Sequence, residues 1–82
     1  MLKRLLLPIS YGTEELEAVA ILDICRRAGI QVHIAKVGPH KAHEHATPIQ
    51  CVMSRGLIMS AEHLIEDCKD FAYDCICLPG GM

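Results

Sequence analysis

The residues best suited to carry chemistry are an acidic side chain near one end of the chain and a Gly-Gly pair near the other. Glu17 lies shortly after Gly12, which follows an apolar run, and Gly80-Gly81 follows the apolar segment 75–78. In parallel α/β sheets, ligands bind at the carboxyl ends of strands, where backbone amides are free. Because both segments follow a predicted strand, we expect them to meet at one edge of a sheet, where Glu17 would donate or accept a proton.

Glu17 occupies an unusual place on the helix that the pattern predicts around it. On a wheel of residues 14–28 it falls inside a wide apolar arc formed by Ala18, Ile21, Leu22, Ile24, Cys25 and Ala28. A carboxylate on the core side costs free energy unless it is paired or protonated. One interpretation is a buried or half-buried Glu17 at a site. The other is a side chain at the margin of this face that swings out to solvent, and the pattern allows both.

Thiols and imidazoles are the other reactive groups. The five cysteines are odd in number and include no Cys-x-x-Cys, so we expect reduced, mostly buried thiols in a cytosolic protein. Cys75 and Cys77 share one face of a predicted strand, which fits core packing better than a redox pair. His40, His43 and His45 fit a solvated loop better than a metal site, because a fourth ligand is missing. We therefore expect no metal and no cofactor.

Composition and charge exclude several classes of protein. Hydrophobic residues make up 51% of the chain, which is too apolar for a disordered segment. A formal net charge of −2 argues against nucleic acid as the main partner. No stretch approaches the ~20 apolar residues of a membrane span. The run Leu5 to Leu7 is too short for a signal peptide.

The elements that must position these residues alternate between strands and helices. We expect strands over 5–9, 30–37 and 71–78, a hairpin of strands 49–53 and 57–59, a helix over 14–28 capped by Thr13, and a short helix over 61–69 capped by Ser60. A strand–helix–strand unit of this spacing predicts a parallel sheet with a right-handed crossover, and hence an α/β fold.

The outer face of the long helix is also partly apolar. Leu16, Val19 and Ala20 lie there among charged residues. A helix that is apolar nearly all round is buried on more than one side, which predicts a self-associating dimer. The alternative is the scattered surface apolar residues that are normal in soluble proteins.

Four segments, taken together, resemble the amino-terminal part of the ThiJ/PfpI superfamily, nearest its Parkinsonism-associated protein deglycase subfamily. They are residues 12–19, 26–30, Ser54-Arg55-Gly56 and 73–81, and the spacing between them also fits. The resemblance implies a flavodoxin-like, class I glutamine amidotransferase-like three-layer sandwich with a mainly parallel sheet. It also implies that residues 1–82 are the amino-terminal part of a single domain, ending before the nucleophile elbow.

The resemblance further implies roles for individual residues. A cysteine on a sharp strand-to-helix turn would be the nucleophile, Glu17 its proton carrier and Gly80-Gly81 the oxyanion loop. Arg55, and Arg27 from a partner subunit, would line the pocket rim. The homodimer interface would contain residues of the long helix and of the hairpin, namely Leu16, Val19, Ala20, Leu57 and Ile58.

The implied activity is that of a cysteine-dependent glyoxalase or deglycase acting on methylglyoxal-like dicarbonyls or early glycation adducts. None of the five cysteines lies on the strained turn that a reactive thiolate needs. We therefore expect the chain alone to be inactive, with the rest of the domain supplied as a second polypeptide. The alternatives are a redox-sensing chaperone dimer of the same fold, a cysteine peptidase of the superfamily and, more remotely, a nucleotide or flavin binder.

Overall fold

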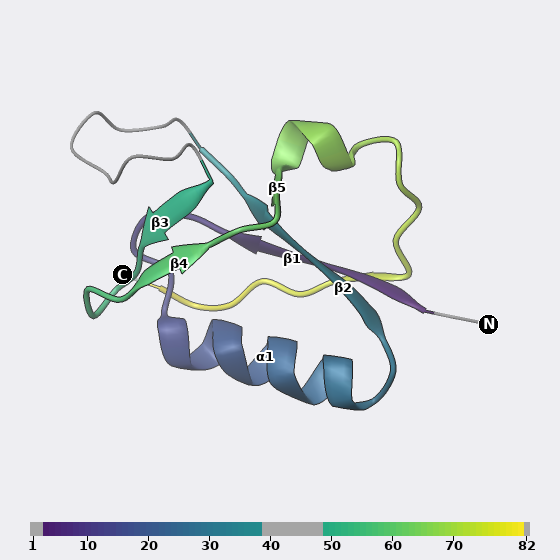
Figure 1. Cartoon of the computed structure of the whole chain (residues 1–82), viewed down its shortest axis with the longest axis horizontal. Helices are drawn as coiled ribbons and strands as arrows, with labels where there is room; N and C mark the ends of the chain where they lie inside the picture. The colour runs from purple at the N-terminus through teal and green to yellow at the C-terminus, as the bar shows by residue number, and fades with distance from the viewer. Residues whose placement is uncertain (1–2, 39–48, 82) are drawn as a thin grey trace.

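The chain folds as a small α/β unit in which one long helix covers one face of a parallel sheet (Figure 1). The computed structural model describes residues 3–38 and 49–81, so the run of His40, His43 and His45 lies outside the described residues. The elements in chain order are β1 (Arg4–Ile9), α1 (Glu15–Arg27), β2 (Gln31–Lys36), β3 (Gln50–Val52), β4 (Ile58–Ser60), β5 (His63–Leu64), the 3-10 helix η1 (Ile65–Cys68) and β6 (Cys75–Ile76).

The main sheet has the strand order β5-β2-β1-β6, and all its pairings are parallel. Leu5 of β1 pairs with Val32 of β2 on one side and with Cys75 of β6 on the other. The strands β3 and β4 form a separate antiparallel hairpin. The predicted parallel α/β sheet and the predicted hairpin are therefore both confirmed.

Apolar side chains cover both faces of β1, as expected for a central parallel strand. Leu7 is fully buried on the α1 side, where burial of one such side chain is worth roughly 1.5–3 kcal/mol. Leu6 faces the other way and packs with Ala35 and Cys68. The core on the α1 side comprises Leu5, Leu7, Ile9, Ala18, Val32, Ile34, Cys51, Met53 and Ala61.

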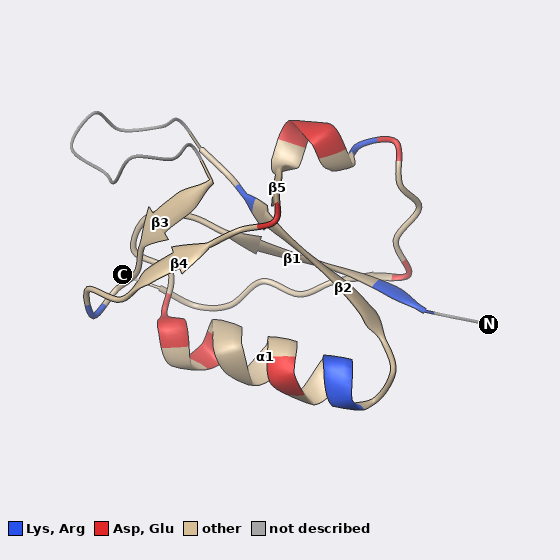
Figure 2. Ribbon diagram, viewed as in Figure 1, with Lys and Arg blue, Asp and Glu red and all other residues tan. Residues whose placement is uncertain are grey.

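Helix α1 begins and ends with recognisable caps. Glu14, not the predicted Thr13, is the N-cap, and its carboxylate accepts the Leu16 N–H at 3.1 Å. The Thr13 hydroxyl is instead used within the preceding turn, where it accepts the Ser10 N–H at 2.9 Å. Gly29, at φ 83°, closes the helix in the left-handed region that glycine adopts most easily. Acidic residues lie at the first turn and arginines at the last, as the helix dipole favours (Figure 2).

The predicted helix over 61–69 is wrong. His63–Leu64 forms strand β5 instead, and the two residues before it bond to other segments: Ala61 N–H donates to the carbonyl of Ile49, and Glu62 N–H to that of Ile34 in β2. Ser60 belongs to β4 and caps nothing, and only Ile65–Cys68 turns as a 3-10 helix. Backbone pairing with the sheet outweighed local helix propensity here.

The predicted strand over 71–78 is too long, because only Cys75–Ile76 pairs with β1 as a strand. Residues 71 and 73 leave the sheet and direct their rings toward His33. Beyond β6, one further backbone bond joins Cys77 N–H to the Leu6 carbonyl, and the chain then turns toward α1.

Two expectations about burial are also wrong. Ile24, placed by the helical wheel on the core side, is 66% exposed, because the buried stripe of α1 is narrower and consists of Ala18 with Ile21, Leu22 and Cys25 beside it. None of the five cysteines forms a disulfide, but only Cys51 and Cys68 are buried, and Cys75 is exposed on the edge strand β6. Within residues 3–38 and 49–81, no helix is long and apolar enough to cross a membrane.

Candidate functional site

The Gly-Gly loop and the first turns of α1 lie against each other where β1 ends. Gly80 N–H donates to Oε1 of Glu17 at 2.7 Å, and Glu14 N–H donates to the Gly80 carbonyl at 2.8 Å. An isolated antiparallel bridge joins Thr13 to Gly81. The structure thus brings together the acidic residue and the loop, which are more than sixty positions apart in the sequence.

At both glycines it is space, rather than backbone angle, that favours the absence of a side chain. A Cβ atom on Gly80 would lie 2.7 Å from Oε1 of Glu17, and one on Gly81 would lie 2.7 Å from the Gly12 carbonyl oxygen and 3.1 Å from Cα of Thr13. Contacts under about 3.0 Å do not occur for real Cβ atoms. Glycine therefore lets the loop approach the carboxylate and the turn before α1 this closely.

Glu17 fits neither of the two environments considered from the sequence. Its side chain is exposed, so it is not a buried carboxyl group, yet it does not extend freely into solvent because the Gly80 N–H holds it. Among the described residues, none accepts a hydrogen bond from the Gly81 N–H. The local arrangement is a carboxylate with one oxygen engaged, beside a backbone N–H that is still able to donate.

A pocket of about 200 Å³ lies next to this contact, at the carboxyl ends of β1 and β2. Its lining residues are Pro8, Ile9, Ser10, Thr13, Val37, Leu78 and Pro79. This is the edge of a parallel sheet at which α/β proteins bind ligands. Glu17 does not line the pocket itself, but Thr13 and Pro79 are close neighbours of the Glu17–Gly80 contact in the chain.

Glu15 fixes the hairpin turn beside the site, and its role was missed from the sequence. Its two carboxylate oxygens accept the Arg55 N–H at 3.0 and 2.9 Å, and Oε2 also accepts the Leu57 N–H at 3.2 Å. Partial desolvation raises the pKa of Glu15, but the backbone N–H groups and the charge of Arg55 outweigh it, so the pKa lies below 4.5. The only signal in the sequence was an acidic residue in a helical first turn.

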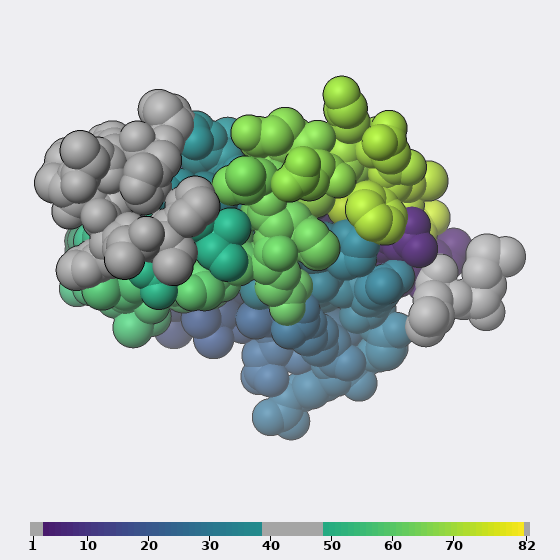
Figure 3. Space-filling model, turned by 45° about the horizontal axis from the view of Figure 1, so that its top comes forward, coloured from purple at the N-terminus to yellow at the C-terminus, as the bar shows by residue number. Residues whose placement is uncertain are grey.

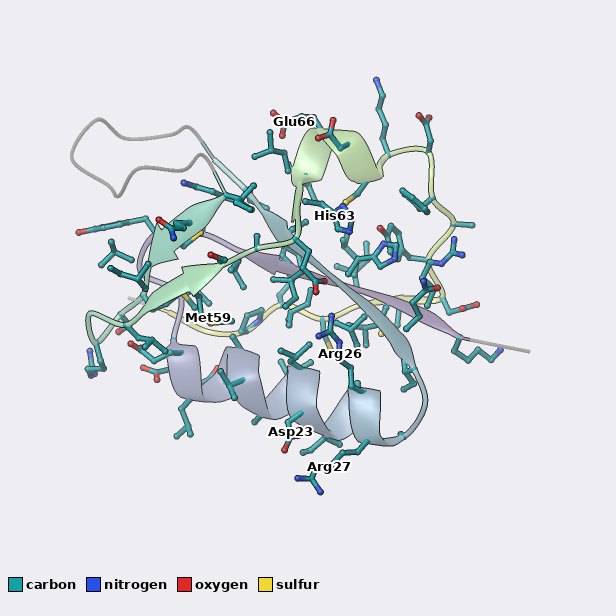
Figure 4. The ribbon with its side chains drawn as sticks, viewed as in Figure 1. Asp23, Arg26, Arg27, Met59, His63 and Glu66 are labelled. Atoms are coloured by element: carbon teal, nitrogen blue, oxygen red, sulfur yellow. The ribbon has the colours of Figure 1, made fainter. Side chains whose placement is uncertain are left out.

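Of the two arginines expected at a pocket rim, Arg55 lies in this hairpin turn, where its guanidinium donates to the Ser54 hydroxyl at 2.9 Å. Arg27 lies at the other end of α1 and pairs with Asp23 at 3.0 Å. Figure 4 shows the side chains of Arg27 and Asp23 pointing away from the sheet. This chain therefore does not bring its own Arg27 to the pocket.

Arg26, which the sequence did not single out, ties the end of α1 to the sheet. Its Nη2 donates to the Val32 carbonyl and to both carboxylate oxygens of Glu62, each at 3.0 Å. Glu62 lies directly before β5, so the Arg26 side chain connects α1 with β2 and with the start of β5.

The apolar residues expected at a dimer interface are all exposed. Leu16 and Val19 on α1 are 76% and 43% exposed, and Leu57 and Ile58 on the hairpin are 50% and 42% exposed. Ala20 is exposed as well. Because Glu15 accepts the Leu57 N–H, the hairpin and the first turn of α1 lie side by side, and their apolar residues belong to neighbouring surfaces.

Cys77, the cysteine next to the Gly-Gly loop in the chain, does not have the setting of an activated nucleophile. Burial, followed by the neighbouring Cys75 and Cys25 thiols, raises the pKa of Cys77, which disfavours its thiolate. In the part of the chain that the structure describes, no three His, Cys, Asp or Glu side chains are grouped as metal ligands would be.

Comparison with known proteins gives a consistent result. The model of the DJ-1/PfpI family matches residues 3–82. The chain is 39% identical over 80 residues to Protein DJ-1 homolog A of Arabidopsis thaliana and 37% identical over 81 residues to the Parkinson disease protein 7 homolog of Danio rerio. Among solved structures it is similar to Toxoplasma gondii DJ-1, described as oxidized, with a TM-score of 0.84 and 39% identity.

These relatives are all considerably longer than this chain. Each match covers 98% of the chain, but only 18% of the Arabidopsis protein, 39% of the Danio protein and 39% of the Toxoplasma structure. The chain therefore spans about two fifths or less of the proteins it matches. Within that span the similarity supports the parallel α/β fold described above.

Proposed function

Because the chain belongs to the DJ-1/PfpI family, we propose that it supplies part of the active site of a cysteine-dependent glyoxalase or protein deglycase. In this proposal Glu17 carries a proton and the Gly80-Gly81 loop holds an oxyanion. The substrates would be methylglyoxal-like dicarbonyls or early glycation adducts. The observation that carries the proposal is the 2.7 Å hydrogen bond between the Gly80 N–H and Glu17, at the carboxyl edge of a parallel sheet.

The chemistry needs a thiolate that adds to the aldehyde carbon of the substrate. The electron pair of the C=O bond moves to oxygen, and backbone N–H groups aimed at that oxygen stabilise it, each by roughly 3–4 kcal/mol. The Gly81 N–H is the candidate donor, since the Gly80 N–H already donates to Glu17. A protonated Glu17 would hydrogen-bond the thiolate and then pass its proton on.

The thiolate would come from a further segment of the same domain. We propose that residues 1–82 form the amino-terminal part of one DJ-1/PfpI domain, which the limited coverage of the matched relatives supports. The open edge of β6, with Ile76 and Leu78 at 59% and 77% exposure, is where that segment would add its strand. Without it the chain would be inactive.

We also propose that the working protein is a homodimer in a reducing compartment such as the cytoplasm. The exposed apolar residues of α1 and the hairpin would form the contact, and Arg27 would reach the pocket of the partner subunit. Five cysteines that form no disulfide support the reducing compartment.

A second candidate function is a redox sensor. It is favoured by the similarity to a Toxoplasma gondii DJ-1 structure that is described as oxidized. In a sensor, the same carboxyl contact would favour oxidation of the cysteine to the sulfinic acid, and carbonyl turnover would be absent.

Methylglyoxal consumption separates these possibilities. The chain would be assayed alone and together with the remainder of the domain, in wild-type form and as Glu17→Ala. Glu66→Gln is the matched control, because Glu66 is an exposed acidic residue on η1, on the side of the sheet away from α1 (Figure 4). We expect no turnover by the chain alone, turnover by the reassembled protein and by the control, and at least a hundredfold loss in Glu17→Ala.

Normal turnover in Glu17→Ala would refute the assigned proton carrier. Absence of turnover in the reassembled wild type, with two oxygen atoms gained by one cysteine under peroxide, would favour the sensor.

A further inference from the structure

A buried histidine lies on the face of the sheet opposite α1, and the proposed function does not use it. His33 of β2 is only 7% exposed, and its Nδ1 lies 2.7 Å from the Tyr73 hydroxyl. Its ring centroid lies 5.0 Å from those of His63 and Phe71 and 5.4 Å from that of Tyr73. These three rings all belong to the segment 61–73, which we call the latch.

The latch begins where the hairpin ends and contains β5 and η1, and its last residues lie beside the start of β1 (Figure 3). Its strand β5 pairs with β2, its residue Cys68 belongs to a small apolar cluster, and its three rings all lie around His33. The next residue, Asp74, is bonded to Arg4 twice: its N–H donates to the Arg4 carbonyl at 2.8 Å, and its carboxylate accepts the Arg4 N–H at 2.9 Å. The latch thus leads directly into β6 and the Gly80-Gly81 loop.

We propose that His33 makes the latch sensitive to pH: while its ring is neutral it holds the latch on β2, and protonation of the ring releases it. This inference concerns a region outside the proposed active site and does not depend on the activity.

Hydrogen bonding gives the first reason. Burial, and then Cys68, raise the pKa of Tyr73 to about 12, so its hydroxyl keeps its proton and can donate to a neutral Nδ1. In the protonated ring Nδ1 carries a hydrogen, so the hydroxyl must turn and accept instead. The contact that suits a neutral ring is thereby lost or reversed at a buried imidazole.

The charges around His33 give the second reason. Burial first, then His63 and Arg4, and more weakly Arg26, lower the pKa of His33, and only Glu62 among its charged neighbours raises it. These groups come from β1, α1 and the latch, which are the elements packed against β2 here. Every one of these charged neighbours except Glu62 therefore opposes a positive charge on the ring.

The direction of the pH dependence follows. The pKa of His33 in the closed state lies below its ordinary value of 6.5, so the open state binds the proton more tightly. The latch is held fully above about pH 6.5 and is progressively released as pH falls from there through the lower pKa of the closed state. Each unit between the two pKa values multiplies the opening constant by about ten.

Hydrogen exchange of the protein at pH 7.5 and 5.5, corrected for intrinsic exchange rates, tests this directly. The reporters are the Glu62 and Phe71 amides, which donate within or beside the latch, and the amides of α1 serve as the internal reference. We expect the latch opening constant to rise severalfold at pH 5.5 in the wild type. In His33→Gln, which keeps hydrogen-bonding groups without titrating, it should be independent of pH, whereas His63→Gln should still respond.

A wild-type latch that opens equally at both pH values would overturn the inference, and so would a response that persists unchanged in His33→Gln. Should that variant fail to fold, an NMR titration of the wild-type His33 ring decides alone. A pKa below 6.5 supports the latch, and a pKa of 6.5 or above rejects it.

Discussion

Adding one methyl group to each glycine of the Gly80-Gly81 loop should have two different outcomes. In Gly80→Ala the new Cβ meets the end of a side chain, Oε1 of Glu17 at 2.7 Å. In Gly81→Ala it meets backbone, the Gly12 carbonyl oxygen at 2.7 Å and Cα of Thr13 at 3.1 Å. A carboxylate can rotate away, but the turn before α1 cannot move without disturbing its neighbours, since Gly12 N–H donates to Val52 and Thr13 accepts from Ser54.

The magnitudes follow from these obstacles. Gly80→Ala displaces Glu17 and loses one charge-assisted hydrogen bond, at most about 1.5–3 kcal/mol and less at this exposed position. Alanine also lowers the conformational entropy of the unfolded chain, which stabilises the folded state by about 0.4–1 kcal/mol. The net loss of stability should therefore be about 1 kcal/mol. Gly81→Ala forces a backbone shift in a packed turn, for which overpacking costs of about 1–3 kcal/mol apply, so we expect about 2 kcal/mol.

A double-mutant cycle read by urea denaturation isolates the contact. In a Glu17→Ala background the obstacle to a methyl group at position 80 is gone, so Gly80→Ala should become neutral or slightly stabilising, while the cost of Gly81→Ala should stay the same. If Gly80→Ala costs as much with Glu17 removed as with it present, the contact between the carboxylate and the loop does not exist in solution. The proposed site would then have no basis.

Three further results are expected, each read by urea denaturation. N–H donors of the hairpin lower the pKa of Glu15, so this carboxylate stabilises the fold above about pH 4.5, and the stabilisation is lost as the pH falls below that value. Glu15→Gln should remove this pH-dependent part of the stability. An unchanged dependence of the unfolding free energy on pH between about 3 and 6 would contradict this. Arg26→Ala should cost about 1 kcal/mol because its partner Glu62 anchors β5, whereas Arg27→Ala, in an exposed pair within the helix, should cost under about 0.5 kcal/mol; equal costs would contradict the anchoring role. Leu7→Ala should cost about 2–5 kcal/mol, since the side chain is fully buried, and a loss under about 1 kcal/mol would contradict that burial.

The parallel sheet could be predicted because its evidence is local and redundant. The run Leu5 to Ile9 has no alternation, Gly29 closes a helix with two arginines in its last turn, and a second apolar run follows at once. Each of these signals is a property of a few adjacent residues, and all agree with one right-handed strand–helix–strand unit. The approach of Gly80 to Glu17 followed from the same topology, because both lie just after parallel strands.

The latch could not be predicted because its structure depends on distant partners. The segment 61–69 has the composition of a short helix, and nothing within it shows that Ile34 and Ile49 will take its backbone N–H groups. The cluster around His33 could not be predicted either, since its three ring partners lie thirty or more positions away in a segment that the pattern assigns to helix and strand. Long-range pairing decided both cases, and single-sequence patterns contain little information about it.

The hydrogen bond between Glu17 and the Gly80 N–H has a consequence for the proposed chemistry. The ionised carboxylate holds this donor by a charge-assisted bond, roughly twice as strong as a neutral one. The proposal requires a protonated Glu17 when a thiolate is next to it, and the hydrogen bond from the Gly80 N–H to a protonated Glu17 is weaker. The Gly80 N–H can then join the Gly81 N–H in stabilising an oxyanion. Arrival of the proton on Glu17 and completion of the oxyanion loop would therefore be coupled through one shared hydrogen bond.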